Sequence, residues 1–73
     1  MDYSETFYNM LEFLQRNYKK FPKFMIEVMA ENFHIPFKEI KPLLHKFRKE
    51  GVLLIVKDEG YTFTLNETMI SND

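Results

Sequence analysis

The sequence predicts a single small α+β domain over residues 1–73, mainly helical, in which three helices precede a two-stranded β-hairpin. Two observations predict this class. Apolar residues recur at three- and four-residue steps through the first two thirds of the chain, as on amphipathic helices. After Gly51 the pattern changes to alternation, which is typical of strands.

Length and composition limit how such a domain is stabilised. A chain of 73 residues is one domain at most, and domains this small bury only about 60% of the surface of the unfolded chain. There is no cysteine, so no disulfide or thiolate metal site can staple the fold. Eight Phe and four Tyr indicate a core built from large rings, which a second copy of the chain could extend.

The first helix is expected at about residues 4–20. Its apolar stripe comprises Tyr3, Phe7, Met10, Leu11, Leu14, Tyr18 and Phe21. Asp2 followed by Glu5, or Ser4 alone, is suited to cap its start, and Pro22 disfavours helical geometry at the preceding residue. Tyr8 and Phe13 fall outside the stripe, so we expect them to pack on another element or on a second subunit.

A shorter helix is expected at about residues 25–33, although no good N-cap residue precedes it. Its inward side chains would be Met25, Val28, Met29 and Phe33, with Ala30 where two helices approach closely.

The third helix is expected at about residues 37–50 and contains two prolines near its start. Pro36 suits the beginning of a helix, where a missing N–H costs nothing. Pro42 inside a helix begun at residue 37 would lose its bond to the Lys38 carbonyl, at about 3 kcal/mol or more. We therefore expect residues 36–39 to be turn-like or loosely wound, with regular helix from about 40 to 50.

The hairpin strands are expected at about residues 52–57 and 61–65, followed by a tail over 66–73. Gly51 is placed to end the third helix, and Gly60 lies in the tight connection between the strands.

One continuous run, "MAENFHIPFKEIKPLLHKFRKEGVL", carries a family pattern. Met29, Ala30 and Glu31 begin the run, Phe33 takes an apolar position, His34 stands at a turn position usually held by glycine, Ile35 takes a buried position, and Ile40, Leu44 and Phe47 form the core side of the following helix. This pattern resembles the helix-turn-helix of winged-helix DNA-binding proteins. The resemblance covers about a third of the chain and implies a winged fold whose third helix enters the major groove.

Three residues or segments depart from that family pattern. His34 replaces glycine where a left-handed backbone is usual, and His is among the residues enriched there. The wing turn carries Asp58 and Glu59 where many members have cations, which argues against contact of the wing with DNA. The third departure is Pro42, on the recognition helix itself.

The third helix predicts a basic face opposite its core face. With Ile40 set at 0° and about 100° per residue, the apolar side chains fall between about −60° and 40°. Lys41, His45, Arg48 and Lys49 fall at about 80–180°, and Lys38 joins them if its turn is helical. These five donors suit phosphate oxygens, and Arg48 or Lys41 could reach guanine edges in a major groove. His34 is expected to be a turn residue rather than a ligand.

Charge and residue types narrow the function classes. Residues 16–49 carry a net charge of +6, between segments of −3 and −4, although the whole chain has −1. Two histidines eleven residues apart support no metal site, and two glycines leave no phosphate-binding loop. We expect no cofactor and no enzyme activity. Since no apolar run can span a bilayer, we expect no membrane contact and a cytoplasmic or nucleoid-associated protein.

Two functions therefore remain open. The first is a sequence-specific double-stranded DNA-binding protein, a small transcriptional regulator working as a homodimer on two half-sites. The residues suggested for the dimer contact are Tyr8, Phe13, Met69 and Ile70. The second is a winged-helix module that docks on another protein, as an adaptor or inhibitor, without binding DNA. Pro42, the acidic wing turn and a pI of 6.1 favour the second.

Overall fold

A computed structural model of the chain describes residues 2–57 and 60–66. The elements in chain order are α1 (Ser4–Asn17), β1 (Phe21–Pro22), α2 (Lys23–Asn32), α3 (Phe37–Lys49), β2 (Leu53–Lys57) and β3 (Tyr61–Leu65). The expected α+β class with three helices is confirmed. The sheet, however, is a three-stranded antiparallel one with the order β1-β3-β2, because a strand that the sequence analysis missed joins the hairpin.

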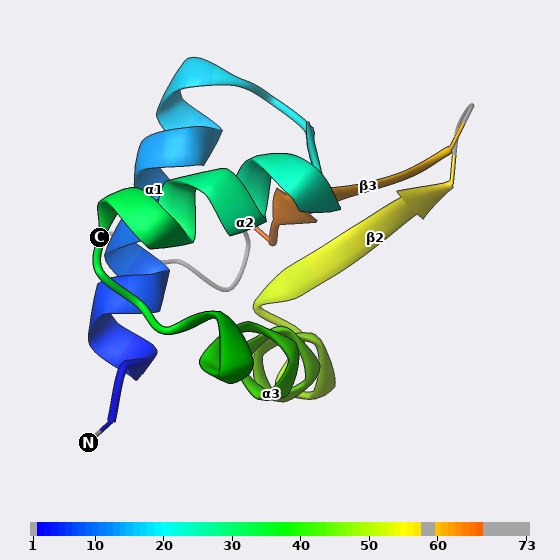
Figure 1. Cartoon of the computed structure of the whole chain (residues 1–73). Helices are drawn as coiled ribbons and strands as arrows, with labels where there is room; N and C mark the ends of the chain where they lie inside the picture. Colours follow the sequence, from blue (N-terminus) through cyan, green and yellow to red (C-terminus); the bar gives the residue numbers. More distant parts are fainter. Residues whose placement is uncertain (1, 58–59, 67–73) are drawn as a thin grey trace, which may run out of the picture.

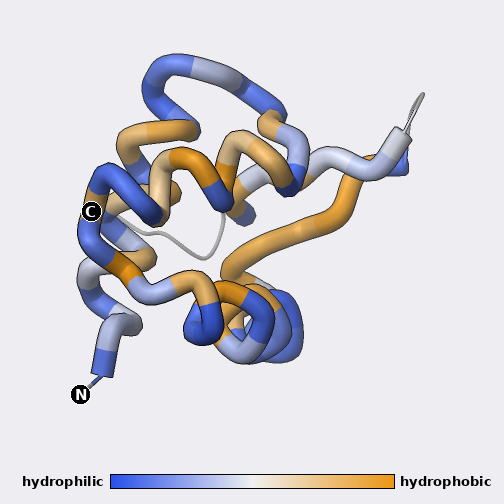
Figure 2. Tube along the Cα trace, in the orientation of Figure 1, coloured by the Kyte–Doolittle hydropathy of each residue, from blue (hydrophilic) through white to orange (hydrophobic). Residues whose placement is uncertain are grey.

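The three helices stack against one side of the sheet and leave the β2–β3 hairpin projecting (Figure 1). α2 crosses in front of α1, and α3 lies below both of them. The hydropathy of the residues follows this arrangement. In α3 the hydrophobic side, coloured orange, faces the other elements, and the hydrophilic side, coloured blue, faces away (Figure 2). Among the described residues, no helix is long and apolar enough to cross a membrane.

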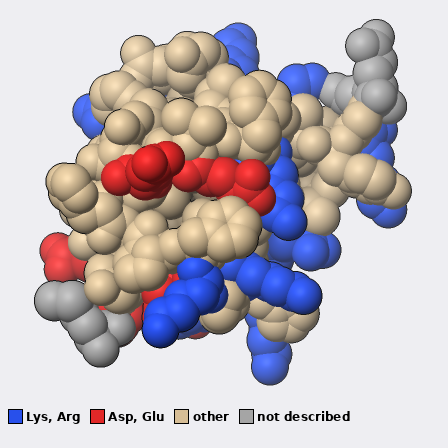
Figure 3. Space-filling model, in the orientation of Figure 1, with Lys and Arg blue, Asp and Glu red and all other residues tan. Residues whose placement is uncertain are grey.

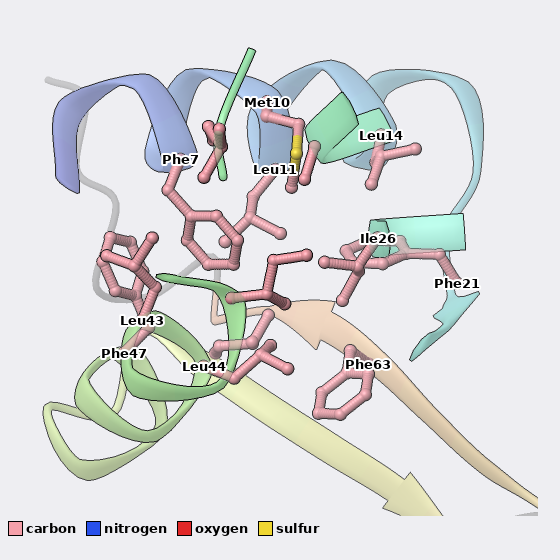
Figure 4. Close-up of a cluster of buried hydrophobic side chains, with 14 of the residues drawn as sticks. Phe7, Met10, Leu11, Leu14, Phe21, Ile26, Leu43, Leu44, Phe47 and Phe63 are labelled. Atoms are coloured by element: carbon pink, nitrogen blue, oxygen red, sulfur yellow. The ribbon is translucent and has the colours of Figure 1, made fainter. Parts of the chain in front are cut away.

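The core lies where α1 meets α3 and the sheet (Figure 4). Phe7, Met10, Leu11 and Leu14 of α1 are fully buried, so the inner part of the predicted stripe is confirmed. They point toward Leu43, Leu44 and Phe47 of α3 and toward Phe21, Ile26 and Phe63. The rings of Phe7 and Phe47 meet edge to face, with centroids 5.2 Å apart, a geometry that adds about 0.5–1.5 kcal/mol to their area burial.

α1 ends at Asn17, three residues earlier than predicted. The Tyr18 N–H donates the last helical bond to the Leu14 carbonyl, and the Tyr18 backbone is already extended. Phe21 is fully buried, but it reaches the core from β1 rather than from a helix. Tyr18 is 48% exposed, so its assignment to the apolar stripe was wrong.

β1 has only two residues, and a side chain of α1 and a backbone carbonyl of the α1–β1 connection make further hydrogen bonds to β3. Phe21 and Pro22 pair with Phe63 and Thr62. Further along β3, the Gln15 Oε1 atom accepts the Leu65 N–H at 3.0 Å, and the Lys19 carbonyl accepts the Thr64 hydroxyl at 2.9 Å. Gln15 therefore takes the place of strand backbone at the end of β3, where the N–H would otherwise lack an acceptor.

α2 begins at Lys23 and ends at Asn32, and its inward face differs from the predicted one. Ile26 and Ala30 are its buried residues, whereas Val28 is 57% exposed. Val28 lies about 200° around the helix from Ile26, so the two cannot share a face. Met25, Met29 and Phe33 pack partly buried against the core. Pro22 occupies the N-cap position without a side-chain cap, as expected from the sequence.

Candidate nucleic-acid interface

The connection between α2 and α3 is a tight left-handed turn at His34, whose φ is 61°. The His34 N–H donates to the Glu31 carbonyl at 3.1 Å, and the Ile35 N–H donates to the Ala30 carbonyl at 2.8 Å. These two bonds form the Schellman arrangement that ends many helices. The expected turn role of His34 is confirmed, and the turn fixes the direction in which α3 leaves α2.

α3 starts at Phe37, with Pro36 as its N-cap residue, and contains Pro42. The expectation of a loose segment over 36–39 was wrong. The first turn is closed by the Glu39 N–H, which donates to the Pro36 carbonyl at 2.9 Å. The helix can contain Pro42 because α3 buries four apolar side chains, each worth about 1.5–3 kcal/mol. That gain exceeds the roughly 3 kcal/mol that an interior proline costs. Ile35 and Ile40, buried on either side of the helix start, also fix the entry of the chain in the manner of a hydrophobic staple.

The C-terminal end of α3 is tied to the sheet. Gly51 has a φ of 80°, and the Val52 N–H donates to the Phe47 carbonyl at 2.9 Å. Asn66, just after β3, donates its backbone N–H to the Val52 carbonyl and its Nδ2 to the Gly51 carbonyl, at 2.8 and 2.9 Å. Both ends of α3 are therefore held by backbone bonds, which gives its outward side chains a rigid support.

α3 has a buried face and a charged face. Ile40, Leu43, Leu44 and Phe47 are 3–7% exposed, as predicted for the core face. The five predicted contact residues, Lys38, Lys41, His45, Arg48 and Lys49, all lie on α3 and are exposed. His45, Arg48 and Lys49 line one shallow hollow, whereas Lys38 and Lys41 lie on the earlier turns and do not line it.

Lys46 has a different role from its neighbours on α3. Its Nζ atom donates to the Ser4 Oγ atom at 2.9 Å, and the Ser4 N–H donates to the Asp2 carboxylate at 2.9 Å. Asp2 thus accepts a hydrogen bond from a backbone N–H that has no partner within α1, as the sequence suggested. The N-cap position itself is occupied by Tyr3. Lys46 joins α3 to α1 and is not one of the five predicted contact residues.

Sequence reasoning missed a second part of the surface, on the α2 side of α3. A hollow between the two helices is lined by Glu27, Glu31, His34, Ile35, Pro36, Phe37 and Ile40. Phe37, the first residue of α3, is 73% exposed. Helical arithmetic from Ile40 could have found it, because it places Phe37 at about 60°, beside the basic face.

Acidic and basic side chains occupy different parts of this face (Figure 3). Acidic groups gather over α2, whereas Lys and Arg gather below them, over α3. The boundary runs along the hollow that contains Glu27 and Glu31. An anionic ligand is therefore attracted to α3 and repelled on the α2 side.

Tyr8 and Phe13, the two aromatic residues outside the predicted apolar stripe, both contact other rings of the same chain. Tyr8 packs on Phe47 with centroids 6.5 Å apart, and Phe13 on Phe33 at 6.4 Å, so both rings find a neighbour within the chain. In the hairpin, the Lys57 Nζ atom lies 5.8 Å from the Tyr61 ring centroid. Asp58, Glu59, Met69 and Ile70 lie outside the described residues.

Three further cations, Arg16, Lys19 and Lys20, border a separate hollow that Leu54 and Val56 of β2 also line. Across residues 2–57 and 60–66, no three His, Asp or Glu side chains are grouped as metal ligands would be. No protein-family model matches the chain, and comparisons with curated proteins and with solved structures find no match either.

Proposed function

We propose that this chain is a winged-helix protein that binds double-stranded DNA, places α3 in the major groove and acts as a small transcriptional regulator. One observation carries the proposal: α3 presents Lys38, Lys41, His45, Arg48 and Lys49 to solvent while its opposite face is clamped in the core. Four of these side chains are lysine or arginine, the residues that most suit phosphate oxygens.

The local backbone supports the same reading. A left-handed turn at His34 joins α2 to α3, and a buried Ile35 follows it, in the register that the helix-turn-helix resemblance implies. The β2–β3 hairpin follows α3 directly in the chain, which is the order that a winged helix would have. β1 adds a strand to that hairpin and anchors it to the helices.

The size of the proposed interface bears on oligomeric state. A single module of this kind buries a small DNA surface, so one copy gives modest affinity. We therefore propose that two copies bind half-sites about one helical turn apart. Each phosphate that a lysine or arginine neutralises releases counterions, so affinity should fall steeply with salt.

The test is a titration of fluorescent duplex DNA at low salt, read by anisotropy. We expect Lys41→Ala and Lys49→Ala to weaken binding and each to reduce the slope of log affinity against log salt by about 0.9. Lys19→Ala removes the same charge from the α1–β1 connection and is the matched control, with little expected effect. Unchanged binding in both α3 variants would show that the proposed face is wrong.

A second function is favoured by the hollow between α2 and α3. Its exposed Phe37 and its two carboxylates, Glu27 and Glu31, suit a partner protein that offers an apolar side chain next to a cation. Under this alternative the chain is an interaction module, an adaptor or inhibitor, that does not bind DNA. No binding of duplex DNA at micromolar protein and low salt would favour it.

A further inference from the structure

Phe37 is the most exposed of the large apolar side chains that the structure describes, at 73%. The other phenylalanine of α3, Phe47, is 5% exposed and belongs to the core. Phe37 is therefore not needed to fill the core. A ring left in water at the first turn of an otherwise well-packed helix suggests a role in binding.

The position of Phe37 places it beside the predicted contact residues. From Ile40 it lies at about 60°, close in angle to Lys41 at about 100°. Arg48, at about 80°, lies on the same side of α3 but about three turns later. Lys41 follows one turn later on the same side of α3, and Lys38 is its sequence neighbour. A nucleic acid held by these two lysines would bring its groove against the ring.

The surroundings of Phe37 narrow what it can contact. Across the hollow stand Glu27 and Glu31, whose carboxylates repel phosphate. The sugar–phosphate backbone of the DNA is thus disfavoured on the α2 side of Phe37. The part of the duplex that can contact the ring is then the floor of the major groove. The major-groove floor presents one apolar group, the 5-methyl of thymine, and phenylalanine is among the residues that contact it.

We infer that Phe37 reads thymine: its ring packs on thymine 5-methyl groups when α3 lies in the major groove. The inference rests on the proposed DNA-binding function and adds a base preference to it. Lys38 and Lys41 hold the flanking phosphates, and Phe37 supplies selectivity that charge alone cannot provide.

The experiment compares two duplexes of about 20 base pairs of alternating A·T sequence, one with thymidine and one in which deoxyuridine replaces every thymidine. They differ only in the 5-methyl group. We expect the wild-type chain to bind the thymine duplex more tightly, by about fourfold for each methyl that the ring covers, as for burial of one carbon group. Phe37→Ala should bind both duplexes equally, at the weaker level, and Phe37→Leu should keep part of the preference.

The comparison separates the possible causes. An effect of deoxyuridine on duplex stiffness would persist in Phe37→Ala, whereas a methyl contact would vanish. The salt slope should be the same in Phe37→Ala and wild type, because no phosphate contact is removed. Equal wild-type affinity for both duplexes overturns the thymine inference and leaves the proposed function standing. Absence of binding to either duplex at low salt overturns both.

Discussion

His34 and Gly51 occupy the same backbone position at the ends of two successive helices. Each has a positive φ, 61° and 80°, and each is followed by a residue whose N–H donates to a carbonyl five positions earlier. The two turns set the directions of α3 and of the hairpin. Glycine adopts this conformation without strain, whereas histidine does so as one of the few tolerated side chains.

Gly51→Ala is expected to lower the free energy of unfolding by about 1–2 kcal/mol, the cost of a left-handed backbone for a residue with a Cβ. An added Cβ would meet nothing within 4 Å, so the loss would come from backbone strain and not from a clash. Gly60→Ala is the matched control, because it too has open space but no left-handed φ. Urea unfolding followed by circular dichroism measures both variants. Equal losses in the two would rule out the strain explanation.

Gln15→Ala is expected to destabilise the fold by about 1–3 kcal/mol, because the partly buried Leu65 N–H loses its acceptor. The same Oε1 atom also lies 3.2 Å from the Thr64 hydroxyl oxygen. Gln15→Glu retains a side-chain oxygen at this position and should preserve most of the stability. Hydrogen exchange at the Leu65 amide, measured by NMR, should accelerate in Gln15→Ala alone. Unchanged exchange there would exclude Gln15 as the acceptor that secures the end of β3.

The sequence predicted α1 and the core face of α3 because their apolar residues share one period over several turns. Tyr18 and Phe21 continue that spacing although the helix has ended, so periodicity alone cannot tell a helical residue from one on the following strand. In α2, apolar residues occur on all sides of a short helix, and the buried phase is set by the contacts of Ile26 and Ala30.

β1 and Phe37 show two other limits. A strand of two residues has no alternation to detect, and its existence depends on pairing with β3, some forty residues later in the chain. The basic residues of α3 were found because charge marks exposure. Phe37 was not, because its angle of about 60° lies at the edge between the core face and the basic face, and only the packing shows that the ring is 73% exposed.

Glu27→Gln and Glu31→Gln are expected to strengthen duplex DNA binding, by roughly two- to fivefold each at low salt, because each removes a repulsive charge beside α3. The gain should shrink as salt screens the charges. Glu5→Gln, an exposed carboxylate on α1, is the control for the change in net charge. Anisotropy titrations at two salt concentrations measure the effect. Weaker binding in either variant would instead indicate that the carboxylate accepts a hydrogen bond from a base.

Tyr8→Phe is expected to make stability less sensitive to alkaline pH. Burial against the core raises the pKa of the Tyr8 phenol above its ordinary value of 10.0, and the Glu12 carboxylate, by its charge and by a hydrogen bond, raises the pKa further. The unfolded chain therefore ionises Tyr8 first. Its contribution is present in full below pH 10 and is lost as pH rises through the higher folded pKa.

Unfolding free energies of wild type and Tyr8→Phe are measured from about pH 8 to 11. The wild-type value should fall more over this range than the Tyr8→Phe value, because only the wild type carries the phenol whose folded pKa is raised. Tyr61→Phe, at a ring that is 67% exposed, is the matched control. Parallel curves for wild type and Tyr8→Phe would contradict the assignment.

Pro42→Ala is expected to raise the free energy of unfolding, by up to about 3 kcal/mol, because residue 42 could then donate its N–H to the Lys38 carbonyl within α3. Position 42 is exposed, so the change leaves the core untouched. Pro42→Gly restores the same N–H but carries the poor helix propensity of glycine, about 1 kcal/mol below alanine. The expected order of stability is thus Ala above Gly, with both compared against wild type by urea unfolding.

The relative stabilities of wild type, Pro42→Ala and Pro42→Gly distinguish two explanations of why α3 tolerates a proline. If both variants are more stable than wild type, burial of the inner face of α3 outweighs a real backbone defect. If both are less stable, the proline stabilises the fold by restricting the unfolded chain, an effect worth about 0.4–1 kcal/mol where the native backbone fits the ring. The affinity of the same variants for duplex DNA tests separately whether the proline shapes the proposed contact face. Lys38, Lys41 and Lys49 keep their places on a regular helix, so a change in affinity would mean that the proline alters the geometry of the contact face.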